Sequence, residues 1–273
     1  MTANTPLPQP SFAQRAFRIP LRARELTPPA VILAAGQGSR LCQPDGPPKP
    51  LMELLGRSLL ERSMRTAHAA GVRRFVVVVG HRQREVAACA TAIAERLGVR
   101  VDIAESRAWE RGNGASALAA EPYVDGRFFL LMADHVYPAA FLTRLVEHDG
   151  AARACALVVD HDLDAVHDLP EATKVRITGR EIVAIGKALS EFDAADTGVF
   201  LCRPPLFDAL RESARHGRHT LGDAVQLLAA RGDVAWTPAA GELWQDVDTP
   251  EDLAVASTRL LAVDSDELLL STS

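Results

Sequence analysis

Three lysines are the first residues in this sequence that suggest chemistry. Of its 30 basic residues, only Lys49, Lys174 and Lys187 are lysine, and the rest are arginine. Arginine cannot replace lysine where a compact charge must fit among phosphate oxygens. We therefore interpret each lysine as a candidate contact to a phosphorylated ligand. The alternative is that three lysines remain by chance.

A glycine-rich turn precedes the first of these lysines. Residues 33–41 read Leu-Ala-Ala-Gly-Gln-Gly-Ser-Arg-Leu and follow a short apolar run. The backbone N–H groups of such a turn can bind phosphate oxygens, and the guanidinium of Arg40 can bind one with two prongs. Lys49 stands between two prolines, which stiffen its backbone. The dinucleotide fingerprint needs a third glycine where Leu41 stands, and no P-loop string occurs. The segment suits triphosphate binding, although a G-x-G alone is usually an ordinary tight turn.

Two further polar positions follow the turn. Asn113 lies between Gly112 and Gly114, where small residues would let a flat base approach the backbone. An ordinary polar helix start is the alternative. Asp134 follows the apolar run 128–133, and ligands of an open α/β sheet bind beyond the carboxyl ends of its strands. Its carboxylate could hold Mg²⁺ or serve as a turn residue.

The second half of the chain adds two polar strings. Asp246 and Asp248 alternate along one extended segment, so we expect their side chains to point to opposite faces. Thr249 with the acidic residues after it forms a good helix start. Earlier, Lys187 and the string Asp196-Thr197-Gly198 would suit an acceptor phosphate and its hydroxyls.

Composition excludes several functional classes. The 273 residues carry a net charge of −5, which argues against a nucleic-acid binder. No apolar run approaches the roughly 20 residues that a transmembrane helix needs, and the N-terminus lacks a signal-like apolar stretch. The four cysteines lie far apart, which favours reduced thiols and a cytoplasmic location over a disulfide framework or zinc site.

The elements that must position these residues follow an alternating pattern. We predict strands over 31–34, 74–79, 99–104 and 128–132, and helices over 58–70, 83–97 and 138–147. This rhythm predicts an α/β, Rossmann-like fold, with a mostly parallel mixed sheet and helices on both faces. Later strands (155–159, 174–177, 182–185, 199–202) and a hairpin at 178–180 indicate a small antiparallel element in the second half. Helices over 204–215 and 220–231, a strand over 234–237 and a helix over 250–261 complete the prediction.

Three segments divide the chain. Residues 1–29 are proline-rich and form an N-terminal tail or arm, residues 30–262 form one domain, and residues 263–273 form a loose C-terminal tail.

Together the motifs resemble the nucleotidyltransferase superfamily that activates sugar phosphates and polyol phosphates. Its signature, Leu-Ala-Ala-Gly-x-Gly-x-Arg and then Lys-Pro-Leu, is matched by residues 33–40 and 49–51. Residues 132–137, 171–175 and 242–249 look like the CTP:inositol-1-phosphate cytidylyltransferases of this superfamily. Asp248 stands where sugar-phosphate thymidylyltransferases usually have glycine. Ala133 stands where the cytidylyltransferases usually have glycine. The resemblance covers nearly all of residues 30–262 and implies the nucleotide-diphospho-sugar transferase fold.

The resemblance implies transfer of CMP from CTP to myo-inositol 1-phosphate, giving CDP-inositol and pyrophosphate for the synthesis of inositol phosphodiesters. It assigns catalysis to Arg40, Lys49 and Lys187. It places Mg²⁺ on Asp134 and on Asp246, two residues after Trp244, with Asp248 as second choice and turned towards the last helix as a cap. The nucleotide would contact Leu33, Ala34, Ala35, Gly36, Gly38, Ser39, Gly112, Asn113 and Gly114. The acceptor would contact Lys174, Lys187, Asp196, Thr197 and Gly198.

Alternatives and partners remain open. The same chemistry could use phosphocholine or a sugar 1-phosphate, and a non-catalytic nucleotide-binding regulator is a second alternative. The resembled family is often fused to a membrane synthase that joins CDP-inositol to another inositol phosphate. Because no transmembrane segment occurs, we expect a stand-alone soluble form whose product passes to a separate membrane synthase. The residues do not indicate an oligomeric state.

Overall fold

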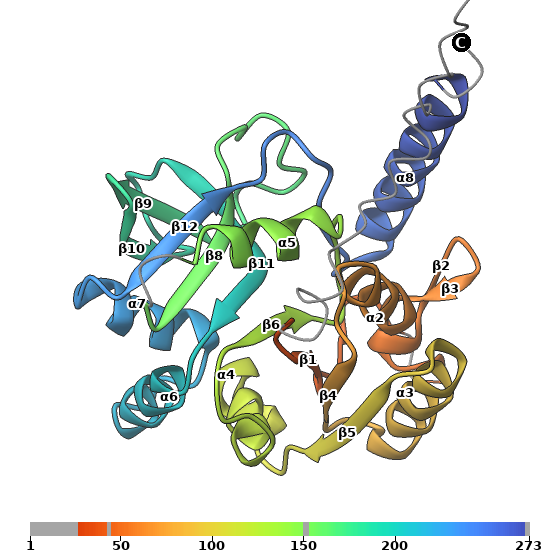
Figure 1. The fold of residues 1–273 in the computed structure, drawn as a ribbon, viewed down its shortest axis with the longest axis horizontal. Helices are drawn as coiled ribbons and strands as arrows, with labels where there is room; N and C mark the ends of the chain where they lie inside the picture. Colours follow the sequence, from red (N-terminus) through yellow and green to blue (C-terminus); the bar gives the residue numbers. More distant parts are fainter. Residues whose placement is uncertain (1–26, 43–44, 150–152, 271–273) are drawn as a thin grey trace, which may run out of the picture.

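A nine-stranded sheet forms the centre of the fold (Figure 1). The computed structural model describes residues 27–42, 45–149 and 153–270. The strands run in the order β5-β4-β1-β6-β11-β8-β12-β10-β9. Their bounds are β1 Ala30–Ala34, β4 Arg74–Val79, β5 Arg100–Glu105, β6 Phe128–Met132, β8 Cys155–Asp160, β9 Lys174–Thr178, β10 Glu181–Gly186, β11 Ala194–Cys202 and β12 Val234–Pro238.

The first four strands are parallel, as predicted. β1 lies between β4 and β6 and pairs in parallel with both, and β5 adds in parallel to β4. The side chains of β1 alternate between two hydrophobic clusters, one on each face of the sheet. Val31 and Leu33 belong to one cluster and Ile32 to the other. This explains why the strand is apolar throughout rather than alternating, because both of its faces are buried.

The second half of the sheet is antiparallel apart from one pairing. β11 pairs antiparallel with both β6 and β8, whereas β12 is parallel to β8. β9 pairs with β10 and also with β11, so this half curls round on itself. The antiparallel element that the sequence predicts is therefore continuous with the main sheet. Short pairings that the sequence did not reveal join β2 (Glu53–Leu54) to β3 (Arg57–Ser58) and β7 (His135–Val136) to β13 (Gln245–Asp246).

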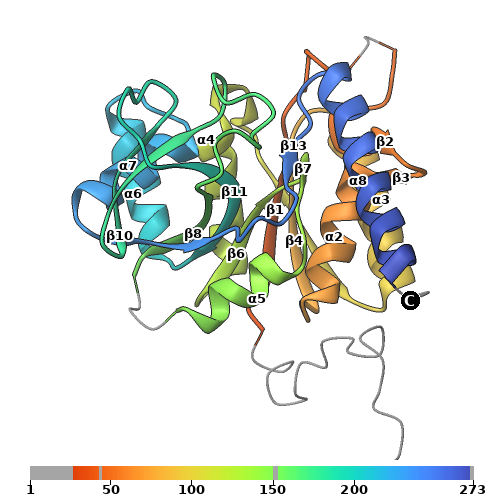
Figure 2. The ribbon, with the colours of Figure 1, turned by 90° about the horizontal axis from the view of Figure 1, so that it is seen from above.

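Helices cover both faces of the sheet, as predicted (Figures 1 and 2). One face is packed by α2 (Leu59–Ala69), α3 (Gln83–Leu97) and α5 (Ala140–Glu147). The opposite face is packed by α4 (Asn113–Ala117), α6 (Pro205–Arg215) and α7 (Leu221–Ala230). Short 3₁₀ helices form η2 (Lys49–Leu51), η3 (Trp109–Arg111) and η4 (Leu118–Tyr123). The two layers leave the carboxyl ends of the central strands open to a ligand.

The last helix is longer than predicted. α8 spans Pro250–Leu270, past the end expected at Leu261, so the supposed loose tail is helical up to Leu270. Its first part packs on a third cluster that includes Leu54, Val247 and Ala256. Residues 1–26 and 271–273 lie outside the described residues, so the predicted N-terminal arm is not tested. None of the described helices combines the length and apolar composition needed to cross a bilayer.

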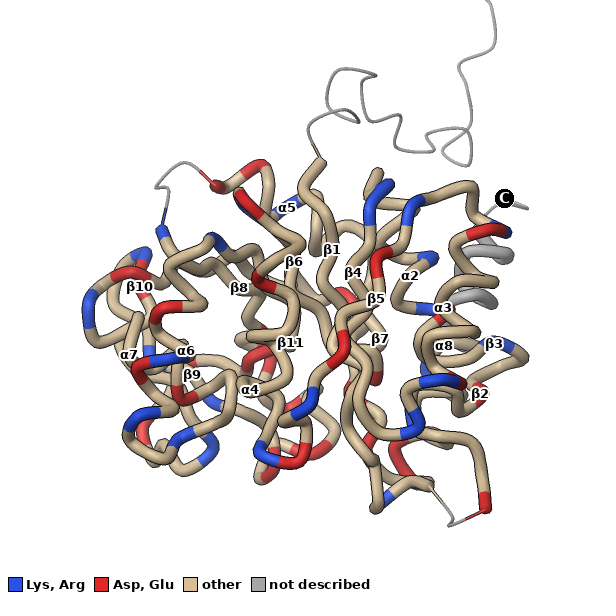
Figure 3. The backbone as a smooth tube through the Cα atoms, turned by 90° about the horizontal axis from the view of Figure 1, so that it is seen from below, with Lys and Arg blue, Asp and Glu red and all other residues tan. Residues whose placement is uncertain are grey.

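Charged residues of both signs are interspersed along the described chain (Figure 3). This view shows no broad stretch of basic positions, in keeping with the net charge of −5.

Candidate functional site

One cavity lies at the carboxyl ends of the central strands. Its volume is about 280 Å³. Residues from both halves of the sheet and from the helices around it meet there. The lining includes Asn113, Met132, Asp134, His135, Asp168, Glu171, Thr173, Lys187, Asp196, Gly198, Leu221, Trp244, Asp246 and Asp248. The cavity therefore brings together most of the charged residues that the sequence singled out.

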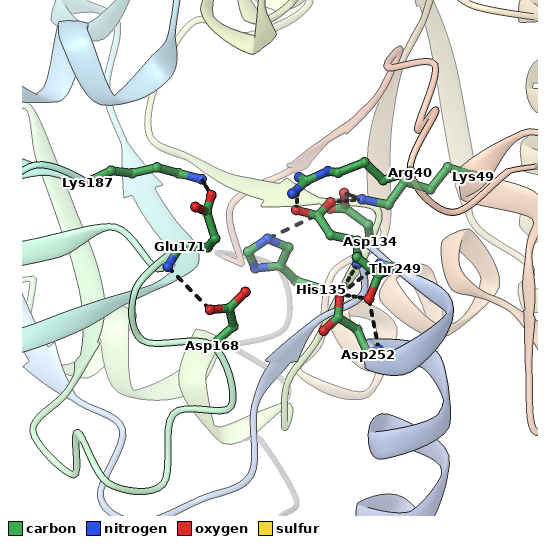
Figure 4. Close-up of polar contacts among 10 residues, drawn as sticks. Arg40, Lys49, Asp134, His135, Asp168, Glu171, Lys187, Thr249 and Asp252 are labelled. Atoms are coloured by element: carbon green, nitrogen blue, oxygen red, sulfur yellow. Dashed lines mark hydrogen bonds and ion pairs between the residues drawn. The ribbon is translucent and has the colours of Figure 1, made fainter.

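Two cations and two carboxylates form a cluster at one end of this cavity (Figure 4). The ammonium of Lys49 contacts both Asp134 and Asp248, and the guanidinium of Arg40 contacts the other oxygen of Asp248. We call these four residues the ion-pair cluster. The Lys49 side chain is 8% exposed, so its charge is held in a poorly solvated place.

The charges of the cluster stabilise one another. Burial alone would lower the pKa of Lys49, but the carboxylates of Asp134 and Asp248 raise that pKa above its ordinary value. Burial would likewise raise the pKa of Asp134, but the charge of Lys49, with a smaller effect of His135, holds it below its usual value. Lys49 is therefore charged and Asp134 ionised at neutral pH.

The glycine-rich turn lies beside this cluster. Backbone N–H groups of Gly36, Gln37 and Ser39 donate to no acceptor in the described part of the chain. Leu41 and Cys42 close the turn by donating to the Gly38 carbonyl at 3.0 Å. Unpaired N–H groups on an exposed turn are the arrangement that binds phosphate oxygens.

Asp248 corrects one expectation. Its side chain contacts Lys49 and Arg40 instead of turning away from the site. Asp246 lines the same cavity, so the two aspartates do not face opposite sides. The reason is that the extended segment β13 ends at Asp246, and the chain bends before α8.

The cap of α8 also differs from the expectation. Asp252, not Asp248, accepts hydrogen bonds from the backbone N–H groups of Asp248 at 3.0 Å and Thr249 at 2.7 Å. The Thr249 hydroxyl in turn accepts from the Asp252 N–H at 3.2 Å. This reciprocal cap fixes the backbone of Asp248, so α8 positions a member of the ion-pair cluster.

Three aspartates, Asp134, Asp246 and Asp248, line the cavity. Asp246 has a raised pKa, first because of its burial and then because Asp248 and Asp134 carry like charges, whereas His135 lowers it. Among the described residues no group of three or more His, Cys, Asp or Glu is arranged as a complete metal site. Mg²⁺ needs only one or two carboxylates and takes other ligands from phosphate and water. The oxygen donors present here suit it.

The other end of the cavity carries Lys187, Glu171, Asp168 and Asp196. Lys187 pairs with Glu171 at 3.4 Å, and its side chain is 58% exposed. Asp196 accepts the Gly198 N–H at 2.8 Å. Burial raises the pKa of Asp196 to about 6, and this hydrogen bond lowers it less. This end offers the exposed cation of Lys187 and several oxygen acceptors, which suits a phosphorylated polyol.

Two of the predicted acceptor residues lie outside the cavity lining. The ammonium of Lys174 is buried and donates to the carbonyls of Pro170 at 2.6 Å and Lys187 at 3.1 Å. The Thr197 hydroxyl is buried and donates to the Val158 carbonyl at 3.0 Å. Both side chains support the loops of the site, because they donate to backbone carbonyls within the protein.

The segment 112–114 also has a structural reason for its glycines. A Cβ on Gly112 or Gly114 would lie 2.8 or 2.7 Å from the carbonyl oxygen of His219. Asn113 accepts the Leu221 N–H at 2.8 Å and lines the cavity. A side chain at either glycine would therefore collide with the loop before α7, while the predicted contact of residues 112–114 with the nucleotide stays a prediction.

Some residues of the cavity lining have no role among the sequence-based predictions. Trp244 donates its indole N–H to Asp160 at 2.7 Å and forms part of the cavity wall. His135, Asp168 and Glu171 also line the cavity. The position of His135 directly after Asp134 was the available signal.

The chain is similar to a known domain family and to several named proteins. Residues 30–224 match the model of the MobA-like NTP transferase domain. A protein of Rubrobacter xylanophilus named as a bifunctional IPC transferase and DIPP synthase is 40% identical over 85% of this chain and 52% of its own length. A protein of the same name from Thermococcus kodakarensis is 36% identical over 85% of this chain and 50% of that protein's length. The chain thus spans about half the length of these curated relatives.

A solved structure shows similar architecture. The inositol-1-phosphate CTP transferase from T. maritima superposes with a TM-score of 0.73 at 29% sequence identity. The match covers 82% of this chain and 90% of that one.

Proposed function

Because this chain belongs to the MobA-like NTP transferase domain family, we propose that it transfers CMP from CTP to inositol 1-phosphate, releasing pyrophosphate. The observation that carries the proposal is the ion-pair cluster, which lies between the glycine-rich turn and a cavity lined by oxygen acceptors. The named activities of the relatives from Rubrobacter and T. maritima support the choice of base and acceptor.

The nucleotide end of the site suits a triphosphate. The free N–H groups of residues 36–39 and the exposed guanidinium of Arg40 would bind the β- and γ-phosphates, which leave as pyrophosphate. Lys49 reaches the cavity from the stiff segment beside the turn, so it would contact the α-phosphate, where charge grows during transfer.

The reaction needs little proton transfer from the protein. The nucleophile is a phosphate oxygen of the acceptor, which is largely ionised at neutral pH because its second pKa is about 6. It attacks the α-phosphorus in line with the departing pyrophosphate, so catalysis rests on positioning and on charge stabilisation. Lys187 at the far end of the cavity would hold the acceptor phosphate.

A magnesium ion would complete the charge balance. Asp134 and Asp246 would hold it, and Asp248 is placed to join them. When bound, the ion would neutralise phosphate charge as Mg²⁺ does in phosphoryl-transfer sites. Asp134 and Asp248 are paired with Lys49, so the same carboxylates would serve both this lysine and the ion.

An assay of nucleotides against acceptors tests the proposal. The purified chain is incubated with Mg²⁺, each of CTP, UTP, ATP, GTP and dTTP, and each of inositol 1-phosphate, phosphocholine and mannose 1-phosphate. Pyrophosphate and product mass are measured. We expect the highest kcat/KM for CTP with inositol 1-phosphate. Arg40→Gln, at an exposed side chain, is the inactive control with an unchanged melting temperature.

Other outcomes discriminate clearly. Preference for another acceptor by tenfold or more would replace inositol 1-phosphate in the proposal. Absence of pyrophosphate with every pair would favour a nucleotide-binding regulator.

A further inference from the structure

His135 lies in the middle of the cavity without a role in the reaction described above. In Figure 4 its ring lies between the Lys187–Glu171 pair and the ion-pair cluster. The side chain is 18% exposed. A polar ring atom in such a place normally has a partner in the protein or in a ligand.

One ring nitrogen of His135 is fixed by the backbone. Nδ1 lies 2.9 Å from the carbonyl oxygen of Thr197. A carbonyl can only accept, so Nδ1 carries the proton of this bond. In the neutral ring, Nε2 is then an acceptor with a free lone pair.

The ring lies directly against Gly198, where any side chain would collide with it. A Cβ added to Gly198 would lie 2.3 Å from Nδ1 of His135, and Gly198 has a φ of +76°. The same loop holds Asp196, whose carboxylate accepts the Gly198 N–H. One turn thus sets the positions of two acceptors, His135 and Asp196, that face the cavity.

The second ring nitrogen has no hydrogen bond to the described residues. Nε2 lies 3.8 Å from a carboxylate oxygen of Asp134, too far for a hydrogen bond. Asp134, Asp196 and Asp246 line the same cavity as the ring. A magnesium ion prefers oxygen ligands, and these carboxylates already supply them. The partner that remains is a donor, and a hydroxyl group of the acceptor is such a donor.

We propose that His135 is a specificity residue that accepts a hydrogen bond from one hydroxyl of the phosphorylated polyol through Nε2. The inference rests on the proposed function, because it assumes that the polyol occupies the Lys187 end of the cavity. It explains why Gly198 leaves room for an imidazole and why Nδ1 is anchored. An acceptor without a suitably placed hydroxyl would lose this bond.

Two substitutions separate the roles of the ring nitrogens. In His135→Asn the amide nitrogen stands near Nδ1 and can still donate to Thr197, but nothing reaches the place of Nε2. In His135→Gln the longer side chain reaches that place with its amide. His161→Asn is the matched control, because the Nδ1 of His161 also lies 3.1 Å from a carbonyl, that of Asp193, but outside the cavity lining.

The assay uses CTP with myo-inositol 1-phosphate and with each of its monodeoxy analogues. We expect His135→Asn to lower kcat/KM for the acceptor about 3–10-fold, the value of one neutral hydrogen bond, with the KM for CTP unchanged. His135→Gln recovers part of this loss, and His161→Asn has no effect. One monodeoxy analogue loses a similar factor with the wild type and nothing further with His135→Asn.

The pattern of losses decides the matter. If every analogue loses the same factor with His135→Asn as with the wild type, the ring contacts no hydroxyl and the inference is wrong. A shift in the Mg²⁺ requirement or in the KM for CTP would also overturn it, since His135 would then serve the metal or the nucleotide. Failure of the wild type to use any inositol phosphate would instead overturn the proposed function.

Discussion

Gly38 lies directly against the side chain of Lys49: a Cβ placed on this glycine would stand 2.4 Å from the Cβ of Lys49. Gly38 also has a φ of +65°, in the left-handed region that favours glycine. The glycine-rich turn and the lysine that follows it in the sequence therefore form one packed unit. A lysine fixed in this way can contact Asp134 and Asp248 without losing much side-chain entropy on binding a ligand.

Substitution of Gly38 by alanine tests this packing. The methyl group would push Lys49 away from the cavity and strain the backbone, at a cost of roughly 1–2 kcal/mol for the left-handed conformation. We expect kcat/KM for the nucleotide to fall much more than the melting temperature. Gly126→Ala is the control, because a Cβ there meets nothing within 4 Å and Gly126 does not line the cavity. Equal melting temperatures with equal nucleotide kinetics in both variants would show that the contact is unimportant.

Asn variants of Asp134 and Asp248 test the shared hold on Lys49. Each should lower kcat about 100-fold, in the range seen when one charge-stabilising group is removed. The double variant should be little worse than either, because both carboxylates act on the same ammonium. The measurement is kcat at saturating CTP, Mg²⁺ and acceptor. Multiplying losses in the double variant would mean that the two carboxylates act independently.

Asp246→Asn tests the third aspartate by a different readout. Since burial and like charges raise the pKa of Asp246, removal of its charge should leave the melting temperature of the metal-free protein unchanged or higher. The rise in melting temperature on adding Mg²⁺ should shrink, because one ligand is lost. An unchanged response to Mg²⁺ would remove Asp246 from the metal site and leave Asp134 with Asp248.

Lys174 and Lys187 should separate stability from function. Lys174→Met leaves the carbonyls of Pro170 and Lys187 without their donor, which costs about 1–3 kcal/mol of stability. Lys187→Met removes an exposed cation, so we expect no thermal effect but a KM for the acceptor raised about tenfold or more. Thermal melts and acceptor kinetics on both variants check this. If Lys174→Met instead raises the KM for the acceptor and Lys187→Met lowers the melting temperature, Lys174 is the phosphate ligand.

The site residues that sequence could place are those whose roles depend on local patterns. Gly38, Arg40 and Lys49 lie in one short segment, and Asp134 follows a buried strand, so their meeting at the strand ends was predictable. Asp248 could not be placed, because alternation holds only while a strand continues, and β13 is two residues long. The bend after Asp246 is set by the cap between Thr249 and Asp252, which is a tertiary detail of α8.

Other roles were hidden because they depend on contacts between distant segments. One is the close approach of Gly114 to the carbonyl of His219, two segments that only the fold brings together. The fold was predicted more fully than the site, since buried strands such as β1 are apolar throughout. The pairing of β9 with β11 was not predicted, because pairing between strands distant in the sequence leaves no local sequence pattern.

Removal of the α8 cap should affect both stability and the site. Asp252→Ala deprives the N–H groups of Asp248 and Thr249 of their acceptor, at a cost of about 1 kcal/mol. Because Asp248 loses its backbone anchor, kcat should fall as well. Ser58→Ala is the matched control, since Ser58 caps α2 by accepting from Glu61 at 3.1 Å, and it does not line the cavity. Equal kinetics for the two variants would dissociate the cap from the site.

Asp196 gives the protein a pH dependence with a definite sign. Its pKa is raised by burial from 3.8 to about 6 in the folded protein. Between these two values the folded state binds more protons than the unfolded state, so this group makes the protein less stable as the pH rises through that window. Asp196→Asn removes the effect. We therefore expect the melting temperature of this variant, relative to wild type, to increase from pH 4 to pH 7 and then to level off. Glu191→Gln, at a side chain that is 85% exposed, controls for the loss of a charge alone. A difference between Asp196→Asn and wild type that stays constant over this range would mean that the pKa of Asp196 is the same in the folded and unfolded states, which contradicts the prediction.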